Sequence, residues 1–398
     1  MEQRIWSAQS LLTMDTEVKP MGDRGARGVV VIVIALIVTA VSAMRFAPLG
    51  PEELEAYPSP SISRVAKAKL SAYNSALLGT AGDTEVLIYE GSQPGGTMLV
   101  VGGTHPDEPA GTVAALILAE NVVVVQGKLI VIPYANASGF THNLPQEGHP
   151  PYYTLSTPGG DRIMKYGSRL TNPVHQWPDP TVYVEKVSYQ KLAGTEARNL
   201  NRAYPGEKNG SLTERVAYAI TRLIIDEEID VSIDLHESSP EYPVNNAVVA
   251  HERAFDLAAI ATLDLEMEGV QINVEPSPPN LRGLSHREWG DNTDTLALLF
   301  ESPNPVQGRL RGVTDADLIV DGVDPMYVKA SERGRLYVPY TSEGTPLAMR
   351  AGRHLASVQA IAAAYSMMAP DRAIVMAGLP SYGEIVANGA GAYLNPSR

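Results

Sequence analysis

Hydrophobic and polar positions alternate along most of the chain in a way that predicts strands and helices in turn. Short apolar runs bounded by turn residues predict buried strands. These runs are EVLIYEG (85–91), TMLVVGG (97–103), KLIVIPY (128–134), VSIDLH (231–236), NNAVVA (245–250) and TLALLFE (295–301). Longer stretches that open on Pro, Ser or Thr and have helical periodicity predict helices. They are PAGTVAALILAEN (109–121), SLTERVAYAITRLIIDEE (211–228) and TPLAMRAGRHLASVQAIAAAY (345–365).

This alternation predicts an α/β fold with a mainly parallel or mixed central sheet flanked by helices. The pattern breaks between 135 and 197, where the sequence becomes polar and rich in Pro and Gly. So long a loop is usually functional.

One apolar run near the N-terminus is too long for a strand: GVVVIVIALIVTAVSAM, from Gly28 to Met44. A membrane span needs roughly 17–25 apolar residues and the core of a signal peptide needs fewer, so the run fits either. Basic residues precede it at Lys19, Arg24 and Arg27, and the acidic stretch PEELE follows it. That asymmetry keeps the N-terminus in the cytoplasm and sends the rest of the chain across the membrane.

The chain therefore divides into four expected parts. We expect a cytoplasmic segment at 1–27, a transmembrane anchor or signal segment at 28–44, a linker at 45–62 and one large domain at 63–398. Val41-Ser42-Ala43 is an acceptable cleavage site, so a cleaved signal and a retained anchor are both open, with the anchor favoured. In either case the domain is membrane-anchored or exported and lies outside the cytoplasm.

The composition argues against some binding partners and excludes some kinds of metal site. The 398 residues carry a formal net charge of −14, with a pI near 5.1. Such a chain is not expected to bind nucleic acid, because phosphate contacts need clustered Lys and Arg. The sequence contains no cysteine, which excludes disulfides and thiolate metal sites. Any transition metal must therefore be held by His and carboxylate side chains.

Residues able to bind a metal stand where several predicted strands end. His105 and Glu108 follow one strand, Asp234 and His236 end another, and Glu301 ends a third. In open α/β sheets, ligands bind at the carboxyl ends of the strands. Two imidazoles and a carboxylate, with a fourth position left for water, form the ligand set of a catalytic zinc site.

The local sequence allows these side chains to converge. Pro106 keeps His105 extended, and the helix begins only near residue 109, so His105 and Glu108 can project from one loop toward one point. Asp234 stands two residues before His236 on the same strand and points to the same side. A carboxylate there is placed to accept the second N–H of the imidazole.

Five ordered motifs give the chain a family resemblance. They are GGTHPDEPAG (102–111), NASGF (136–140), RNLNRAYPG (198–206), IDLHES (233–238) and FESP (300–303). In this set the chain resembles the zinc carboxypeptidase superfamily, and more closely its succinylglutamate desuccinylase/aspartoacylase branch. The resemblance runs from about 85 to 305, roughly half of the chain.

The resemblance implies a zinc carboxypeptidase-like fold and a zinc-dependent hydrolase domain. It implies that His105, Glu108 and His236 bind one Zn²⁺ per chain, and that Glu301 is the general base. It also implies roles for the polar residues of the third motif. Asn201 and Arg202 would grip a substrate carboxylate, and Arg198 would polarise the scissile carbonyl. Apart from the resemblance, Arg169 in the long excursion could serve in place of Arg198.

Three departures from the family pattern bear on this reading. Pro106 stands where most members have Gly after the histidine, but the spacing of the ligands is kept. Asn199 stands where RDLNR has Asp, which removes a charge beside the arginines. The family's second, C-terminal β-domain is not evident in the sequence.

The leading hypothesis is a zinc metallohydrolase that acts on the C–N (amide) bond of an N-acyl amino acid, with a metal-activated water and Glu301 as base. One alternative is a metallocarboxypeptidase-like peptidase that acts on short peptides with a free C-terminus. Another is a non-catalytic zinc- or ligand-binding relative. The membrane is the further expected partner, through residues 28–44.

Several further polar residues are candidates for a lid or for the surface. The stretch GLSHREWGDNTD (283–294) is either a lid that carries His286 or Arg287, or a surface loop. Glu237, next to His236, is expected to point away by strand alternation. The histidines without ligand spacing are expected at the surface. They are His142, His149, His175, His251 and His354.

Overall fold

The computed structural model describes residues 23–45, 54–59, 65–143 and 148–396. The chain divides into two compact units, Met1–Ala47 and Pro48–Arg398. The first contains α1 (Asp23–Arg45). Within it, Gly25–Met44 has a mean hydropathy of 2.4 and none of that window is buried. Among the described residues this is the one helix long and apolar enough to cross a membrane, and a signal sequence has the same properties. The expected segments 1–27 and 45–62 lie largely outside the described residues.

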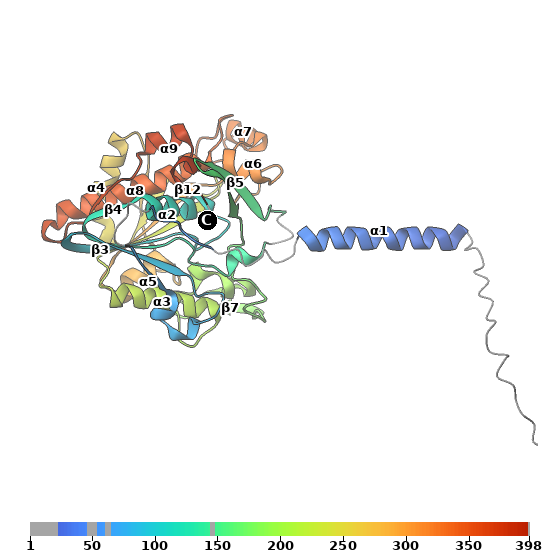
Figure 1. Cartoon of the computed structure of the whole chain (residues 1–398), viewed down its shortest axis with the longest axis horizontal. Helices are drawn as coiled ribbons and strands as arrows, with labels where there is room; N and C mark the ends of the chain where they lie inside the picture. The colour runs from blue at the N-terminus through green and yellow to red at the C-terminus, as the bar shows by residue number, and fades with distance from the viewer. Residues whose placement is uncertain (1–22, 46–53, 60–64, 144–147, 397–398) are drawn as a thin grey trace, which may run out of the picture. The chain divides into compact units, whose positions relative to one another are not determined.

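A mixed sheet forms the centre of the second unit, with nine strands among the described residues (Figure 1). Its order is β1-β2-β4-β3-β9-β12-β10-β11, and β13 pairs with β4. The central strands β4, β3, β9 and β12 are parallel to one another, and antiparallel pairs flank them. The strands are β1 (Val65–Lys69), β2 (Glu85–Glu90), β3 (Gln93–Val101), β4 (Val123–Ile132), β9 (Val231–Ser238), β10 (Ala247–Ala250), β11 (Asn273–Pro276), β12 (Leu296–Pro303) and β13 (Val375–Ala377).

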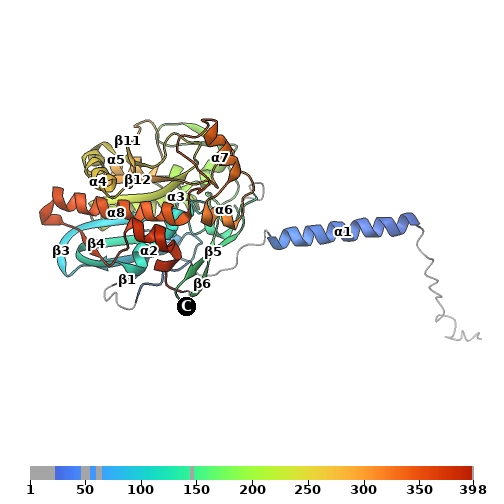
Figure 2. The ribbon, with the colours of Figure 1, turned by 90° about the horizontal axis from the view of Figure 1, so that it is seen from above.

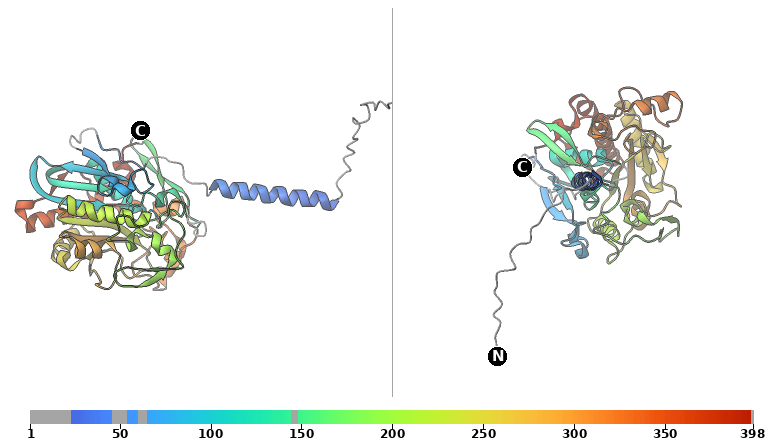
Figure 3. Two further views of the ribbon diagram at one scale, coloured as in Figure 1. Left: turned by 90° about the horizontal axis from the view of Figure 1, so that it is seen from below. Right: turned by 90° about the vertical axis from the view of Figure 1, so that its right-hand side faces the viewer.

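Helices cover both faces of the sheet because the central strands are apolar on both sides. In β3, Met98 and Val100 belong to one core cluster, and Leu99 and Val101 belong to the other. Helices α2 (Pro109–Asn121), α4 (Phe255–Met267), α8 (Leu347–Met368) and α9 (Tyr382–Asn388) pack on the first face. Helices α3 (Leu212–Asp226) and α5 (Ser285–Asn292) pack on the second. Figure 2 shows the layer of α8 and α2 from above, and the left view of Figure 3 shows the opposite layer.

The long polar excursion is more ordered than the sequence suggested. It contains two small hairpins, β5 (Tyr152–Thr157) with β6 (Gly160–Lys165), and β7 (Val182–Val184) with β8 (Lys191–Ala193). Two short helices, α6 (Ala316–Asp321) and α7 (Pro325–Glu332), follow the last central strand.

The structure confirms the predicted fold class, a mixed sheet flanked by helices with an apolar N-terminal helix. Each strand predicted from an apolar run is found, as are the three predicted helices. The capping box predicted at Ser211 and Glu214 is formed at the start of α3. Strands β1, β11 and β13 were not predicted, because each lies at an edge of the sheet and has too few apolar residues to form a run.

Candidate metal centre and its cavity

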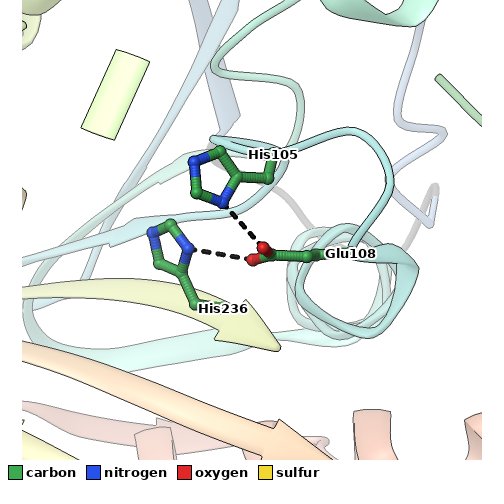
Figure 4. A group of neighbouring side chains, drawn as sticks. All are labelled: His105, Glu108 and His236. Atoms are coloured by element: carbon green, nitrogen blue, oxygen red, sulfur yellow. Dashed lines mark hydrogen bonds and ion pairs between the residues drawn. The ribbon is translucent and has the colours of Figure 1, made fainter. Parts of the chain in front are cut away.

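Two histidines and one glutamate from separate elements meet at one buried point (Figure 4). His105 lies in the turn after β3, Glu108 immediately precedes α2, and His236 lies near the end of β9. The Nδ1 atoms of His105 and His236 are 2.7 and 2.9 Å from the two carboxylate oxygens of Glu108. Their ligand atoms all lie within 4.8 Å of one another, so this group could hold a metal ion. The structure thus brings together the three predicted ligands.

Close backbone approaches place Glu108 against β9. A Cβ on Gly111, in the first turn of α2, would meet the carbonyl oxygen of Leu235 at 2.4 Å, so only glycine lets the helix come so near the strand. At that distance the backbone N–H of Glu237 donates to Glu108 Oε2 at 3.0 Å. Gly103, with φ of +66°, turns the chain sharply out of β3 toward the same point. The carboxylate is therefore fixed before any ligand binds.

The second nitrogen of His236 is held by Asp234, as predicted. The Nε2 atom lies 2.8 Å from Asp234 Oδ2, and the hydroxyl of Thr104 donates to the other carboxylate oxygen at 2.8 Å. A carboxylate only accepts, so Nε2 carries a proton. In the neutral ring the lone pair is then on Nδ1, which faces Glu108.

The second nitrogen of His105 is held in the same way, by an amide. Its Nε2 lies 2.9 Å from Asn199 Oδ1. The orientation of that amide follows from its other contacts, because its Nδ2 donates to Glu196 and its Oδ1 accepts from the backbone N–H of Asn201. Arg169 NH2 lies 3.2 Å from His105 Nδ1 and 3.3 Å from Glu108 Oε1, so its guanidinium faces the same carboxylate oxygen as the imidazole.

The electrostatics of the group favour a cation. Burial alone would raise the pKa of Glu108, but His105 and His236 lower it well below its usual value. Burial would lower the pKa of His236, but Asp234 and Glu108 raise it well above its usual value. Two neutral imidazoles would direct two lone pairs at a carboxylate, an arrangement that repels unless a positive charge lies between them. The donor set therefore fits a divalent metal ion.

Glu301 lies beside this group on the neighbouring strand. It is the register partner of His236 in the parallel pair β9–β12. Burial, followed by the nearby Glu108 carboxylate, raises the pKa of Glu301 to about 8. Its Oε2 atom is buried and has no hydrogen-bond partner among the described residues. A carboxyl group of this kind can take up and release a proton near neutral pH.

A cavity of 490 Å³ opens above the metal-binding group. Glu301 lines it, and so do Arg169, Asn201 and Arg202. Arg169 NH2 is 3.3 Å from Glu108 Oε1, and Arg202 is held by the carbonyl of Asn201 at 2.6 Å. Both predicted carboxylate-binding residues therefore share the cavity with the predicted ligands and base.

Comparisons with known proteins place these features in context. No family model matches the chain. The N-alpha-acetyl-L-2,4-diaminobutyric acid deacetylase of Halomonas elongata is 27% identical over 144 residues, 36% of this chain and 28% of that protein. The chain thus spans about a quarter of the length of this relative.

The solved structures that match include a succinylglutamate desuccinylase/aspartoacylase from Rhodobacter sphaeroides, 20% identical, which covers 55% of this chain and 51% of that chain with a TM-score of 0.34. A metallo-carboxypeptidase from Burkholderia cenocepacia is 12% identical and covers 77% of this chain and 66% of that one, with a TM-score of 0.44. Structures of the family and of the superfamily suggested by the five motifs are thus among those that match.

Arg198 is not placed where the family pattern implied. Its guanidinium forms a two-pronged ion pair with Asp179, at 2.7 and 2.9 Å, and donates to the carbonyl of Thr171 at 2.6 Å. The side chain is buried in these contacts and does not line the cavity. The alternative candidate, Arg169, does line it.

Other polar residues also differ from expectation. The stretch 283–294 is neither a lid nor a surface loop, because it forms the buried helix α5 with His286 in the cavity wall. The expectation of surface histidines is wrong for His251 and His354, which are 3% and 1% exposed. Glu237 points away from the metal-binding group, as predicted, and its carboxylate pairs with buried Arg350.

Two functional contacts escaped the sequence reasoning. The contact of Asn199 with His105 joins residues 94 positions apart. The RNLNR motif contained the signal, since Asn199 stands at a position where the family has a carboxylate. The second contact is that of the Glu237 backbone with Glu108, for which no side-chain pattern exists.

Proposed function

We propose that the protein is a zinc-dependent amidohydrolase that cleaves the amide bond of an N-acyl amino acid. The observation that carries the proposal is the buried group of two imidazoles and one carboxylate, with the unpaired Oε2 atom of Glu301 beside it. The name of the Halomonas elongata relative, a deacetylase of an N-acetylated amino acid, supports the same class of reaction.

His105, Glu108 and His236 are the residues that would hold the zinc ion. Zinc bound in such a site supplies an acidified water and a positive charge that polarises a carbonyl. Asn199 and Asp234 hold the Nε2 atoms of the two imidazoles, so Nδ1 of each ring is the atom that would bind the ion.

Glu301 is the proposed general base. It accepts a proton as the water oxygen forms a bond to the carbonyl carbon, and it delivers that proton to the nitrogen as the C–N bond breaks. The products are a carboxylic acid, which keeps the second proton of the water until it ionises, and a free amine. The raised pKa of Glu301 allows its carboxyl group to hold the proton between the two steps.

Arg169 and Arg202 have separate proposed roles, in stabilising the oxyanion and in binding the substrate carboxylate. Arg169 reaches the metal-binding group itself and is placed to stabilise the negative charge that develops on the carbonyl oxygen. Arg202, with Asn201 beside it, offers the planar donor fork that suits the α-carboxylate of the substrate.

Removal of the Arg202 fork is expected to weaken recognition of the substrate carboxylate. We expect Arg202→Ala to lower kcat/KM for an N-acetyl amino acid by roughly tenfold to a hundredfold, mainly through KM, because a charge-assisted hydrogen bond contributes about 1.5–3 kcal/mol. Steady-state kinetics on the acid and on its carboxamide check this. With the unchanged protein, kcat/KM for the carboxamide should be lower than kcat/KM for the acid by the same factor. In the variant, kcat/KM for the carboxamide should fall little further. An equal loss on both substrates would contradict this role.

Removal of the Asp234 carboxylate is expected to weaken zinc binding without abolishing it. We expect Asp234→Ala to reduce zinc affinity by roughly 10–100-fold, because His236 loses the acceptor that fixes its ring. Asp234→Asn, which keeps an acceptor, should recover part of that loss. Competition with a chelator measures both affinities. Unchanged affinity in the Ala variant would show that Asp234 does not orient the ligand.

One experiment tests the proposal as a whole. The purified chain is assayed for bound metal and for hydrolysis of a panel of N-acyl amino acids and short peptides. We expect one zinc per chain and activity on the acyl amino acids. Activity only on peptides with a free C-terminus would favour the peptidase alternative. Zinc without hydrolysis of any substrate would favour the non-catalytic one.

A further inference from the structure

The cavity extends away from the metal-binding group across three neighbouring strands. Leu299 of β12 is the register partner of Val249 of β10, and Val249 is in turn the partner of Glu275 of β11. Paired residues in a sheet face the same side, and Leu299 stands two residues before Glu301 on the same strand. All four side chains line the cavity. A row of residues thus leads from the proposed base across the sheet to a second carboxylate.

The middle of this row is apolar. Leu299 and Val249 are 2% and 7% exposed, yet they belong to neither of the two core clusters that hold the neighbouring residues of β12 and β10. Tyr242, Leu281 and Leu284 form further walls of the same cavity. Such a surface suits an unbranched aliphatic chain.

Glu275 ends the row and is available for a ligand. Its side chain is half-buried, and no hydrogen bond or ion pair involves its carboxylate among the described residues. The other cavity carboxylates are engaged: Glu108 is a proposed ligand, Glu301 is the proposed base, and Glu237 pairs with Arg350. A carboxylate beside apolar walls calls for a cationic partner.

The spacing limits the length of that partner. Two strand-to-strand steps and two residues along a strand separate Glu301 from Glu275, which is about 12 Å between their backbone positions. The two carboxylate side chains and the extended side chain of a basic amino acid together bridge such a distance.

We propose that Glu275 recognises an ammonium group, and that the substrate is an N-acyl α-amino acid with a long basic side chain. The proposal rests on the proposed amidohydrolase function. In this arrangement Arg202 and Asn201 hold the α-carboxylate, Leu299 and Val249 contact the methylene groups, and Glu275 pairs with the terminal amine. Glu275 is thus a specificity residue, not a catalytic one.

The test compares Nα-acetyl-L-lysine with Nα-acetyl-L-norleucine, which has an aliphatic side chain without the charge. With the zinc-loaded full chain we expect kcat/KM to favour the lysine substrate about tenfold, mainly through KM. Glu275→Gln should bring this ratio close to one through a loss of kcat/KM on the lysine substrate. Glu268→Gln, at an exposed position at the end of α4, is the matched control and should keep the preference.

Binding of the products separates this proposal from the proposed function. Calorimetry of free L-lysine and L-norleucine needs no turnover, so a Glu275-dependent preference for lysine would support the inference even in a protein that hydrolyses nothing. Equal binding and equal kinetics in the unchanged protein and in Glu275→Gln would overturn it. A second result would also overturn it: Glu275→Gln lowers kcat/KM for glycyl-L-norleucine, but not for the N-acetylated form of that dipeptide or for the lysine substrate. Glu275 would then recognise the N-terminal amine of a peptide.

Discussion

Replacement of His105 by alanine is expected to give a folded protein that binds no zinc and has no measurable hydrolase activity. The imidazole supplies one of three ligand atoms, and among the described residues this metal-binding group contains no histidine besides His105 and His236. The Arg169 guanidinium beside it can only donate, so it cannot take the vacated position. Metal analysis of the purified variant and a hydrolysis assay with added zinc measure the two losses.

The stability of the same variant provides an independent readout. Zinc at a thousandfold excess over its dissociation constant should stabilise the unchanged protein by about 4 kcal/mol, and it should leave His105→Ala unaffected. The control is His175→Ala, at an exposed position outside the cavity, which should keep both zinc and activity. Full activity of His105→Ala without bound metal would refute the proposed metal centre.

The ligand set was predictable because its determinants are local. An apolar run identifies a strand, the end of a parallel strand identifies an edge of the sheet, and HxxE places two side chains on one turn. Parallel pairing then requires that His236 and Glu301, each at the end of its own run, lie side by side. Asp234 follows from the same period of two along β9.

The direction of the Arg198 side chain could not be predicted in this way. The sequence gives its residue type and its distance from Asn201 and Arg202, but not the side toward which a short 3-10 turn directs it. The ion pair with Asp179, in the long polar excursion, sets the direction of the Arg198 side chain. A contact between two irregular segments has no period in the sequence that would reveal it. Arg169 comes from the same excursion, and no period in the sequence reveals that its side chain lies in the cavity wall.

Glu275 was missed for a different reason. Its strand, β11, has four residues with the sequence NVEP, and a run of that length with one apolar residue at its centre does not predict a strand. Without the strand, Glu275 is one polar residue in a stretch rich in proline. The register with β10 is what turns it toward the cavity.

Substitution of Glu301 by glutamine is expected to separate catalysis from metal binding. Glutamine keeps the size of the side chain but cannot accept the proton of the attacking water, so kcat should fall by roughly 10²–10⁴-fold while one zinc per chain is retained. The pH dependence of kcat/KM gives a second measure. A base works when deprotonated, so activity of the unchanged protein should rise with pH through the pKa of Glu301, and the variant should lack that limb.

The midpoint pH of this rise in activity follows from the pKa of Glu301. Burial and the Glu108 carboxylate raise the pKa of Glu301 to about 8, and a bound zinc ion adds positive charge that lowers it again, so the midpoint should lie below pH 8. Glu268→Gln removes an exposed carboxylate outside the cavity and should leave both turnover and the profile unchanged. If Glu301→Gln kept full turnover with zinc bound, another group would have to carry the proton. The buried, unpaired Oε2 of Glu301 would then need a different explanation.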